Sequence, residues 1–508
     1  MTGDRLRPDV SLTVEYSDET PFGGPMTQRL EDNLRHLFGT ILTVAREIGP
    51  AAAVERSEEL LAELRRHSDY LRLVDPGDPE RLLPEVLYPD ADLVRPTAIT
   101  VAASGPGDEF RLDFDPALLA PLHDVFAALD GDGAPAEAPP GQLYETVLDA
   151  LRAHDMLLPV GPDPATDDAW RSDLTFVGHN TVVVRSNTTQ VVVDPWFLPE
   201  SESYPASYQP IQRRELGRSD ALLVTHSHPD HFDPGSLLRF HRRTPVIVPE
   251  VTRESMLATD MARRVHESGF EDVRILRWWE ETAVGDIKIA ATPFFGEQPT
   301  TGARWCPDVR NAGNTYLVRT PRLSCAFLAD SGRDGAGDVR DVALAAYRRW
   351  GPVDVVFGGY RGWHLYPIQY VWSSLRRFLL FVPPELYSVR QSIMNATSDA
   401  VDTAEAWHAH YLAPYGDGGA PWYWRAGLGP DLSRTDGGSR TSWFFDPPPE
   451  QCVEELALRS AASAESPVES RVRPLVLRPG QSARMDAGNF VIIDAERHRW
   501  PWLGGSGG

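Results

Sequence analysis

An α/β fold with a layered core is the architecture that this sequence predicts, and two observations predict it. Short β-branched runs separated by turn residues (LTFVG, TVVVRS and QVVVDP) begin at residue 174 and indicate a meander of strands. Further along the chain, apolar runs such as PVIVP and DVVFGG alternate with helical stretches such as 339–350. This alternation is typical of helices that cover a sheet.

Composition restricts the class of function. The chain has 508 residues, 42% of them apolar, so it can bury a large core. Its formal charge of −24 argues against nucleic acid or an anionic membrane as the main partner. The first ten residues lack the apolar segment of a signal peptide, and no apolar run approaches the ~20 residues that span a bilayer. Three widely spaced cysteines form no CxxC pair, so we expect a reducing cytoplasm.

Three domains are expected. Residues 1–168 form an α-rich accessory domain for dimerisation or docking, because 27–48 and 142–151 have helical apolar spacing on either side of a Pro/Gly-rich loop at 131–141. Residues 169–430 form the catalytic α/β domain. Residues 431–508 form a small β appendage with a flexible Gly-rich tail.

The segment ALLVTHSHPDHFDPGS carries the strongest functional signal. It places His226, His228, Asp230 and His231 within six residues, directly after the apolar run 221–224. Imidazole and carboxylate groups together suit divalent transition metals. Four such groups at the end of one strand can serve two neighbouring metal ions. The alternative is a polar loop in which histidines happen to cluster.

Three segments in order (TFVGHNTVVV, QVVVDPWF and VTHSHPDH) resemble the metallo-β-lactamase superfamily over roughly residues 173–420. The resemblance implies an αββα sandwich of two mixed sheets flanked by helices, with metal ligands in loops at one edge. It assigns His226 and His228 to the first metal, and Asp230 and His231 to the second.

A later aspartate normally bridges both metals in this superfamily. Asp330, in FLADSG after an apolar stretch, stands at that place. The alternative role for Asp330 is that of a helix cap or turn residue.

Glu297 departs from the usual superfamily pattern. Zinc hydrolases of this fold place another histidine on the first metal, between the histidine-rich motif and the bridging aspartate. The corresponding segment here, IKIAATPFFGEQPTTG, has no histidine, and Glu297 stands at that position. A carboxylate makes the site more anionic and richer in hard oxygen donors, which favours iron over zinc. The alternative, a solvated loop carboxylate, leaves the first metal short of a ligand.

The last ligand of the second metal has several candidates. His364, in GGYRGWHLYP, is preferred because it sits just past an apolar strand; the alternatives, in WHAHYLAPYGDGG, are His408, His410 and Asp417. His179 and Asp194 are expected to brace ligands through hydrogen bonds rather than to bind metal.

A glutamate at this position, behind a large N-terminal domain, resembles the CmlA-type non-haem diiron β-hydroxylases. The resemblance implies a diiron centre held by His226, His228, Asp230, His231, Glu297 and Asp330, with Glu297 and Asp330 as its catalytic carboxylates. It implies an O₂-dependent monooxygenase of natural-product biosynthesis. The substrate would be an aminoacyl or acyl group, hydroxylated at its β-carbon while tethered as a thioester to a carrier protein or coenzyme A. A homodimer is also implied.

Hydroxylating an unactivated C–H bond requires an oxidant that side chains cannot supply, so a metal cofactor must provide it. The chain has no flavin or Fe–S motif, and an external electron donor is therefore expected. Aromatic residues near the ligands in sequence are candidates for an apolar pocket, although most are expected to be plain core: Trp278, Trp279, Phe294, Phe295, Trp305, Tyr360, Trp363 and Tyr366.

A carrier protein or coenzyme A brings negative charge, so docking on this acidic chain needs local basic groups. The candidates are arginine pairs at 213–214, 242–243, 263–264, 348–349 and 376–377. The alternative for each pair is an ordinary solvated helix face.

Three rival functions are considered. The first is a dinuclear zinc hydrolase (a lactonase, thioesterase or phosphodiesterase), and Glu297 is the feature against it. The second is a flavodiiron-type reductase, which usually has glutamate where this chain has His228 and also carries a flavodoxin module. The third is a scaffold without metal, which the intact histidine motif disfavours.

Overall fold

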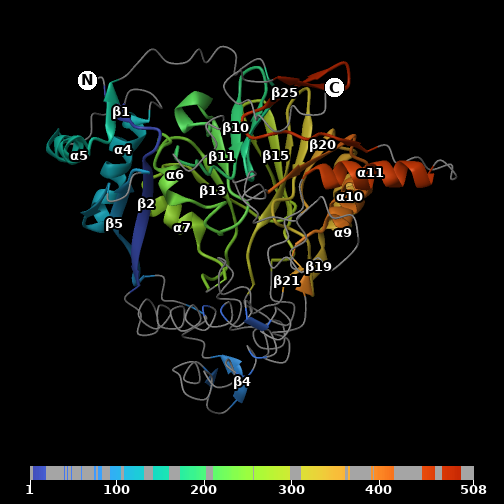
Figure 1. Cartoon of the computed structure of the whole chain (residues 1–508), viewed down its shortest axis with the longest axis horizontal. Coiled ribbons are helices and arrows are strands. Elements are labelled where there is room, and N and C mark those ends of the chain that lie inside the picture. Colours follow the sequence, from blue (N-terminus) through green and yellow to red (C-terminus); the bar gives the residue numbers. More distant parts are fainter. Residues whose placement is uncertain are drawn as a thin grey trace.

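The computed structural model describes residues 4–18, 92–104, 108–130, 141–159, 172–201, 210–255, 257–297, 310–360, 394–416, 449–463 and 472–493, with short pieces between 39 and 88 and at 364–365 and 391–392. Two large mixed sheets face one another at its centre (Figure 1). No helix in the described part is long and apolar enough to cross a membrane.

The first sheet has eight strands. In spatial order they are β13 (Val273–Leu276), β12 (Val246–Pro249), β11 (Ala221–Leu223), β10 (Gln190–Val193), β9 (Thr181–Arg185), β8 (Leu174–Gly178), β25 (Ser482–Asp486) and β26 (Asn489–Ile493). The strands from β10 to β13 are parallel and the others pair antiparallel. The β-branched runs predicted as a meander are confirmed as β8, β9 and β10.

The second sheet has seven strands. They are β14 (Glu281–Val284), β15 (Ile287–Pro293), β16 (Asn314–Arg319), β17 (Ser324–Phe327), β20 (Val355–Gly359), β23 (Tyr411–Tyr415) and β24 (Arg473–Pro474). The first four pair antiparallel, and β17, β20, β23 and β24 run parallel. Short two-stranded pairs lie outside both sheets: β1 (Asp4–Leu6) with β7 (Leu157–Pro159), β3 (Val74–Asp75) with β4 (Asp78–Leu82), β18 (Arg333–Asp334) with β19 (Gly337–Asp338), and β21 (His364–Leu365) with β22 (Gln391–Ser392).

Side chains of alternating direction bury both faces of each sheet. In β9, Val182 and Val184 enter the core between the sheets, whereas Val183 packs outward under α6 (Pro234–Leu237) and α7 (Met261–Glu267). On the far side, α9 (Val339–Trp350), α10 (Thr397–Ala406) and α11 (Glu450–Ser463) cover the second sheet. A strand with two buried faces needs apolar residues at every position, which is why these runs lack polar alternation.

The N-terminal region contains a sheet that sequence reasoning missed. Strands β2 (Ser11–Asp18), β5 (Val94–Ala102) and β6 (Glu109–Asp113) pair antiparallel, and α4 (Leu119–Leu129) and α5 (Gly141–Ala153) share a core with them. The predicted helix at 142–151 is confirmed as part of α5. Of the predicted helix at 27–48, residues 39, 43, 47 and 48 are helical, and the rest lies outside the described residues.

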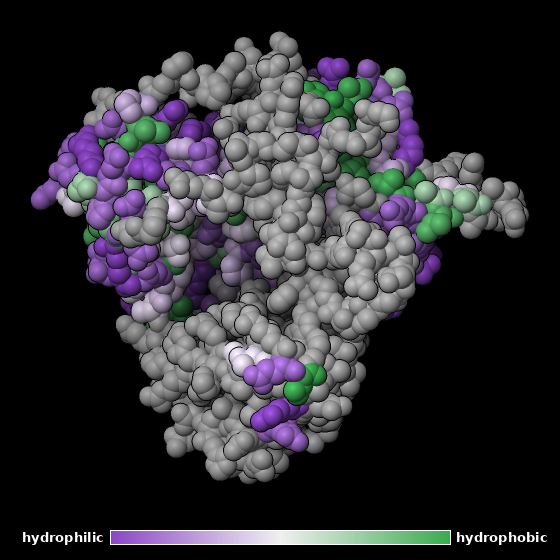
Figure 2. Space-filling view, viewed as in Figure 1, coloured by the Kyte–Doolittle hydropathy of each residue, from purple (hydrophilic) through white to green (hydrophobic). Residues whose placement is uncertain are grey.

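This region packs closely on the catalytic core. The Arg242 guanidinium pairs with Asp124 at 2.6 Å, and Arg239 donates to the Val10 carbonyl at 2.6 Å. Leu238 lies in the same hydrophobic cluster as the N-terminal side chains. Figure 2 shows a mainly hydrophilic surface over the described N-terminal elements at the left, so their apolar side chains face inward.

The C-terminal segment contributes a strand or hairpin to each sheet. The hairpin of β25 and β26 extends the first sheet beside β8, and β24 extends the second beside β23. The domain boundaries at 168 and 430 stay predictions.

Gly235 provides a test of the contact between β2 and α6. A Cβ atom at this position would lie 1.8 Å from the Leu12 carbonyl oxygen, closer than any van der Waals contact allows. We expect Gly235→Ala to lower the free energy of unfolding by about 1–3 kcal/mol, because backbone must shift to admit the methyl group. Denaturant unfolding measures this.

The matched control is Gly335→Ala, where a Cβ atom meets nothing within 4 Å. Equal stability of the two variants would contradict the close packing of β2 on α6.

Candidate metal centre

The histidine motif lies where β11 leaves the first sheet. Ala221, Leu222 and Leu223 are fully buried, and the chain then turns through the motif into α6. Asp233 caps α6 by accepting from the Gly235 and Ser236 amides. This cap marks the end of the loop. Within the loop, the amide of His231 donates to the carbonyl of His228 at 3.0 Å. The result is a rigid turn between a buried strand and a capped helix.

The two sheets are tied together beside this turn. His226 forms an isolated antiparallel bridge with Gly313, and the Tyr316 hydroxyl donates to the Val224 carbonyl at 2.9 Å. Loops from the second sheet therefore meet the motif at one edge of the sandwich.

A first group of possible metal donors consists of His226, His228 and Glu297. The Glu297 Oε2 atom lies 3.0 Å from His226 Nε2 and 2.7 Å from His228 Nδ1. All three residues are buried, and Asn311 Nδ2 donates to the same carboxylate oxygen at 3.2 Å. The carboxylate thus points into the cluster, and the alternative of a solvated loop residue is wrong.

A second group consists of His226, His231 and Asp330. His231 Nε2 lies 3.1 Å from Asp330 Oδ2, and the amide of Asn180 lies 3.4 Å from Asp330 Oδ1. Asp330 follows β17 in the second sheet, whereas both histidines follow β11 in the first. The carboxylate therefore reaches the motif from the opposite sheet.

A third group consists of His179, Asp230 and His231. His179 Nε2 lies 2.9 Å from Asp230 Oδ2, so the expected bracing contact of His179 is present. The His231 ring uses its second nitrogen to contact Asp194: Nδ1 lies 2.8 Å from the Asp194 Oδ2 atom. Asp194 also accepts from the Thr225 amide and hydroxyl at 2.7 and 2.6 Å, which fixes the end of β10 against the start of the motif.

Unusual backbone conformations concentrate here. Of the eight non-glycine residues with positive φ in the described part, four lie in or beside these groups: His179, Asp194, Glu297 and Ala329. Such conformations cost about 1–3 kcal/mol each and persist where surrounding contacts enforce them. The Tyr415 hydroxyl, which accepts from the Ala329 amide at 2.5 Å, is one of those contacts.

Electrostatics pair the buried imidazoles with buried carboxylates. Burial lowers the pKa of His226, and neighbouring His231 lowers it further. Burial also opposes charge on His228, but the Glu297 carboxylate outweighs it and raises the pKa of His228. In the same way, burial is outweighed by Asp330 and Asp194, which raise the pKa of His231 well above its usual value.

The pKa values of the two aspartic acids, Asp230 and Asp330, are lowered. Burial alone would raise the pKa of Asp230 and Asp330, but the adjacent His231 holds both values well below their usual range. Both groups are therefore ionised oxygen donors at neutral pH. Metal binding to such a cluster displaces the protons held by the imidazoles.

Of the candidates for the last ligand of the second metal, the structure describes the side chains of two, His408 and His410. His408 stacks on Tyr347 with ring centroids 4.0 Å apart, and His410 lies 3.5 Å from Asp354. Both stand at the start of β23, and the metal-donor groups lie near its other end, where the Gly416 amide donates to the His179 carbonyl at 2.8 Å. The side chain of His364 and all of Asp417 lie outside the described residues.

The aromatic residues predicted as candidates for an apolar pocket lie in different parts of the structure. Phe294 is buried and its ring lies 5.0 Å from that of His226, and Trp278 packs on Phe295 with centroids 5.4 Å apart. Trp279 packs on Trp350 under the helices of the second sheet. Trp305, Trp363 and Tyr366 lie outside the described residues.

Sequence reasoning missed three polar residues. Asn180 and Asn311 donate to Asp330 and Glu297, and Asp334 accepts from the Gly296 amide at 3.0 Å, directly before Glu297. Asn180 was detectable, since it follows His179 in the singled-out segment TFVGHN. The other two are brought in by loops of the second sheet, and nothing in their local sequence marks them.

Comparison with known proteins agrees with this geometry. Residues 189–373 match the family model described as a beta-lactamase superfamily domain. The 4-amino-L-phenylalanyl-[CmlP-peptidyl-carrier-protein] 3-hydroxylase of Streptomyces venezuelae is 31% identical over 225 residues, which are 42% of this chain and 39% of that protein. A metal-dependent hydrolase of Halorubrum lacusprofundi is 35% identical over 81 residues, 16% of this chain and 28% of that protein. The chain thus spans well under half the length of either relative.

Among solved structures, the crystal structure of CmlA, a diiron beta-hydroxylase from Streptomyces venezuelae, superimposes with a TM-score of 0.56 at 18% identity. The match covers 97% of this chain and 99% of CmlA. The chain therefore has the metallo-β-lactamase αββα fold. The resemblance predicted from the motifs is confirmed, in sequence over the central segment and in fold over nearly the whole chain.

Asp194 gives a test of how the His231 ring is oriented. In Asp194→Asn the ring loses its carboxylate partner, and we expect affinity for divalent transition metal to fall about 10- to 100-fold. Equilibrium titration with a chromophoric chelator measures it. Asp220→Asn, at the opposite end of β11 where Asp220 accepts from the Gln190 amide at 2.9 Å, is the control. Equal metal affinity in both variants would mean that Asp194 has no part in the site.

Proposed function

We propose that this protein is an O₂-dependent diiron monooxygenase that hydroxylates the β-carbon of an aminoacyl or acyl group held as a thioester. The similar hydroxylase of Streptomyces venezuelae is named for an aminoacyl group on a peptidyl carrier protein, which supports a carrier-bound substrate here. Coenzyme A thioesters and a role in natural-product biosynthesis belong to the same proposal.

In this proposal, His226, His228 and Glu297 would hold one iron ion, Asp230 and His231 would hold the other, and Asp330 would be a ligand shared by both. The donor chemistry fits, since every group is an imidazole nitrogen or a carboxylate oxygen. The ligand atoms lie within 4.8 Å of one another in each of the three groups described above, which together contain all six residues. His226 Nε2 is buried and makes no well-directed hydrogen bond, although Glu297 is 3.0 Å away. A buried lone pair without a donor is the state expected of a metal ligand. His364 remains the proposed last ligand of the second iron.

The position of Glu297 is the observation that carries the proposal. The Glu297 side chain is only 4% exposed, and its carboxylate stands against both histidines of the first group. With Asp230 and Asp330 it brings three carboxylates into the site. Oxygen-rich donor sets favour iron over zinc and stabilise its higher oxidation states.

When bound, the iron pair supplies the oxidant that cleaves the C–H bond. The side chains do the rest. Asp194 and His179 orient His231 and Asp230, and Asn311 holds the Glu297 carboxylate. Phe294 covers His226 and keeps water from that side of the site. Glu297 and Asp330 are the proposed catalytic carboxylates.

The proposed hydroxylation requires an electron-transfer partner. Hydroxylation with O₂ consumes two electrons beyond those of the substrate, so the proposal includes an external reductase. A homodimer and a cytoplasmic location complete the proposal, and the buried thiol of Cys325, which forms no disulfide, supports a reducing compartment.

The predicted arginine pairs mostly have internal partners. Arg242 pairs with Asp124, Arg243 with Glu271, and Arg263 and Arg264 with Glu267. Arg213 is fully buried over Phe240, and Arg349 lies 3.7 Å from Glu281. Residues 376–377 lie outside the described part. These contacts favour structural roles over carrier docking.

The zinc hydrolase alternative is less supported, and Glu297→His tests both functions. This change gives the first metal the third imidazole typical of zinc hydrolases. We expect wild-type protein from iron-supplemented growth to carry about two iron atoms per chain, and the variant to exchange iron for zinc. Elemental analysis and the visible absorption spectrum provide the measurement.

Glu455→His, on α11 where Glu455 pairs with Arg459, is the control and should keep its iron. Two zinc ions in the wild type, with thioester cleavage in the absence of O₂, would replace the monooxygenase with a hydrolase.

A further inference from the structure

Asn180 is a buried amide among the metal-donor groups. It follows His179 in the turn between β8 and β9, and its side chain is fully buried. The Nδ2 atom lies 3.1 Å from His231 Nε2, 3.4 Å from Asp330 Oδ1 and 3.4 Å from His179 Nε2. One side-chain atom therefore touches both of the donor groups that contain His231.

The distances around Asn180 are those between neighbouring ligands of one ion. Metal–donor bonds of about 2.1 Å place adjacent donor atoms about 3.0 Å apart in octahedral coordination and about 3.4 Å apart in tetrahedral coordination. The Nε2 atom of His231 and the Oδ2 atom of Asp330, both proposed ligands, are 3.1 Å apart. The Asn180 amide stands at the same separation from these two residues, so it occupies a ligand position of the second metal.

The contact between Asn180 and His231 is incompatible with a metal on His231. The Nε2 atom that faces the amide is the one free to bind a metal, because Nδ1 faces the Asp194 carboxylate at 2.8 Å. Half a turn about the terminal bond of the Asn180 side chain, a broad and two-fold torsion, exchanges Nδ2 with Oδ1. This turn presents a carbonyl oxygen, which is a hard donor suited to divalent cations.

The oxygen of the same amide is an independent sign of a ligand. Asn180 Oδ1 is buried and, among the residues that the structure describes, accepts no hydrogen bond. Buried acceptors are normally paired, so this oxygen remains available to a cation. Gly416 leaves space beside the amide for the turn, because its backbone carries no side chain there: a Cβ atom would lie 3.2 Å from Asn180 Oδ1.

The histidines considered for the last ligand lie elsewhere where the structure describes their side chains. His408 and His410 stand at the start of β23 and contact Tyr347 and Asp354. Asn180 lies near the opposite end of that strand, within the metal-donor groups.

We propose that Asn180 is a ligand of the second metal through its side-chain oxygen, in addition to Asp230, His231 and Asp330. The proposal rests on the two-metal site of the proposed function but not on hydroxylation, because an amide oxygen suits iron and zinc alike. It adds a neutral donor to the second metal, whereas Glu297 adds a charged one to the first. The two ions therefore differ in the charge of their surroundings.

Competition for zinc tests this without O₂ or reductant. Full-length protein loaded with Zn²⁺ is titrated with a chromophoric chelator, which reports the affinity for each of two ions. We expect Asn180→Ala to bind the second ion at least about tenfold more weakly than the wild type. Asn180→Asp keeps an oxygen donor at the same place and should bind that ion at least as tightly as the wild type.

The order of the two variants separates a ligand from a positioning residue. If Asn180 only donates a hydrogen bond to Asp330, the new carboxylate of Asn180→Asp would repel Asp330 and bind zinc no better than Asn180→Ala does. That order, or an unchanged affinity in Asn180→Ala, would overturn the proposal.

Two further backgrounds identify which ion Asn180 binds. His228→Ala lacks a proposed ligand of the first metal, and Asp230→Ala lacks one of the second. Adding Asn180→Ala should weaken binding of the ion that remains in His228→Ala and leave the ion that remains in Asp230→Ala unchanged, because separate sites respond independently. The reverse pattern would place Asn180 on the first metal and contradict the proposal.

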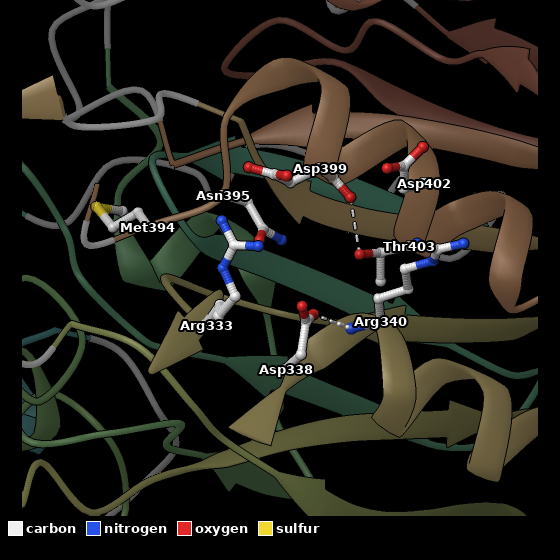
Figure 3. Close-up of a pocket in the computed structure, with 8 residues that line it drawn as sticks. All are labelled: Arg333, Asp338, Arg340, Met394, Asn395, Asp399, Asp402 and Thr403. Carbon is white, nitrogen blue, oxygen red and sulfur yellow. Dashed lines mark hydrogen bonds between the residues drawn. The ribbon is translucent and has the colours of Figure 1, made fainter. Parts of the chain in front are cut away.

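Asn395→Ala is the matched control. This amide is also buried, at 4% exposed, and its Nδ2 atom has no acceptor among the described residues. It lines a separate cavity with Arg333 and Asp399, and no histidine is among the side chains that line it (Figure 3). Asn395→Ala should keep the zinc affinities of the wild type, and thermal unfolding checks that every variant is folded.

The outcome is separable from that of the proposed function. If the protein hydroxylates nothing but the Asn180 variants change zinc affinity in the expected order, the ligand stands and the monooxygenase fails. If hydroxylation occurs and Asn180→Ala binds both ions as tightly as the wild type, the reverse holds.

Discussion

The pairing of buried imidazoles with buried carboxylates is the interaction on which the rest of the site depends. His226, His228 and His231 are at most 8% exposed, as are Glu297 and Asp330. Uncompensated charges at such depth are costly, so each carboxylate is held against an imidazole or an amide donor. Those contacts come from loops of both sheets. The sandwich is therefore closed at this edge by the same groups that are proposed to bind metal.

Asp194 shows how the strands of the first sheet position the side chains of the proposed metal site. One fully buried carboxylate joins the end of β10 to Thr225 at the start of the motif and to His231 within it. Asp334 acts similarly on the other side, where it contacts both the Gly296 amide and Arg310. The geometry of the centre thus depends on residues that need not touch metal, as is general for metal sites. Rigid strands on both sides keep these loops from relaxing.

Local pattern predicted much of this protein. Continuous β-branched runs and the spacing of HSHPDH are signals within a few residues, and β8 to β11 and the motif lie where they indicate. Asn311 and Asp334 were not predictable, because their roles arise from contacts between loops far apart in the chain. The N-terminal sheet was missed because β5 pairs with β2 across some 80 residues of the chain, which no local pattern indicates. The left-handed backbone at Glu297 likewise depends on tertiary contacts, because no glycine marks that position.

The most direct test of the central claim is the fate of labelled O₂. Iron-loaded protein, a chemical reductant and aminoacyl thioesters on a carrier protein are incubated under isotopically labelled O₂, and the released product is examined by mass spectrometry. The account predicts one labelled oxygen atom in a hydroxyl group at the β-carbon, with no incorporation in Glu297→His. A product whose only new oxygen comes from water, formed equally without O₂, would contradict it and assign the fold to hydrolysis.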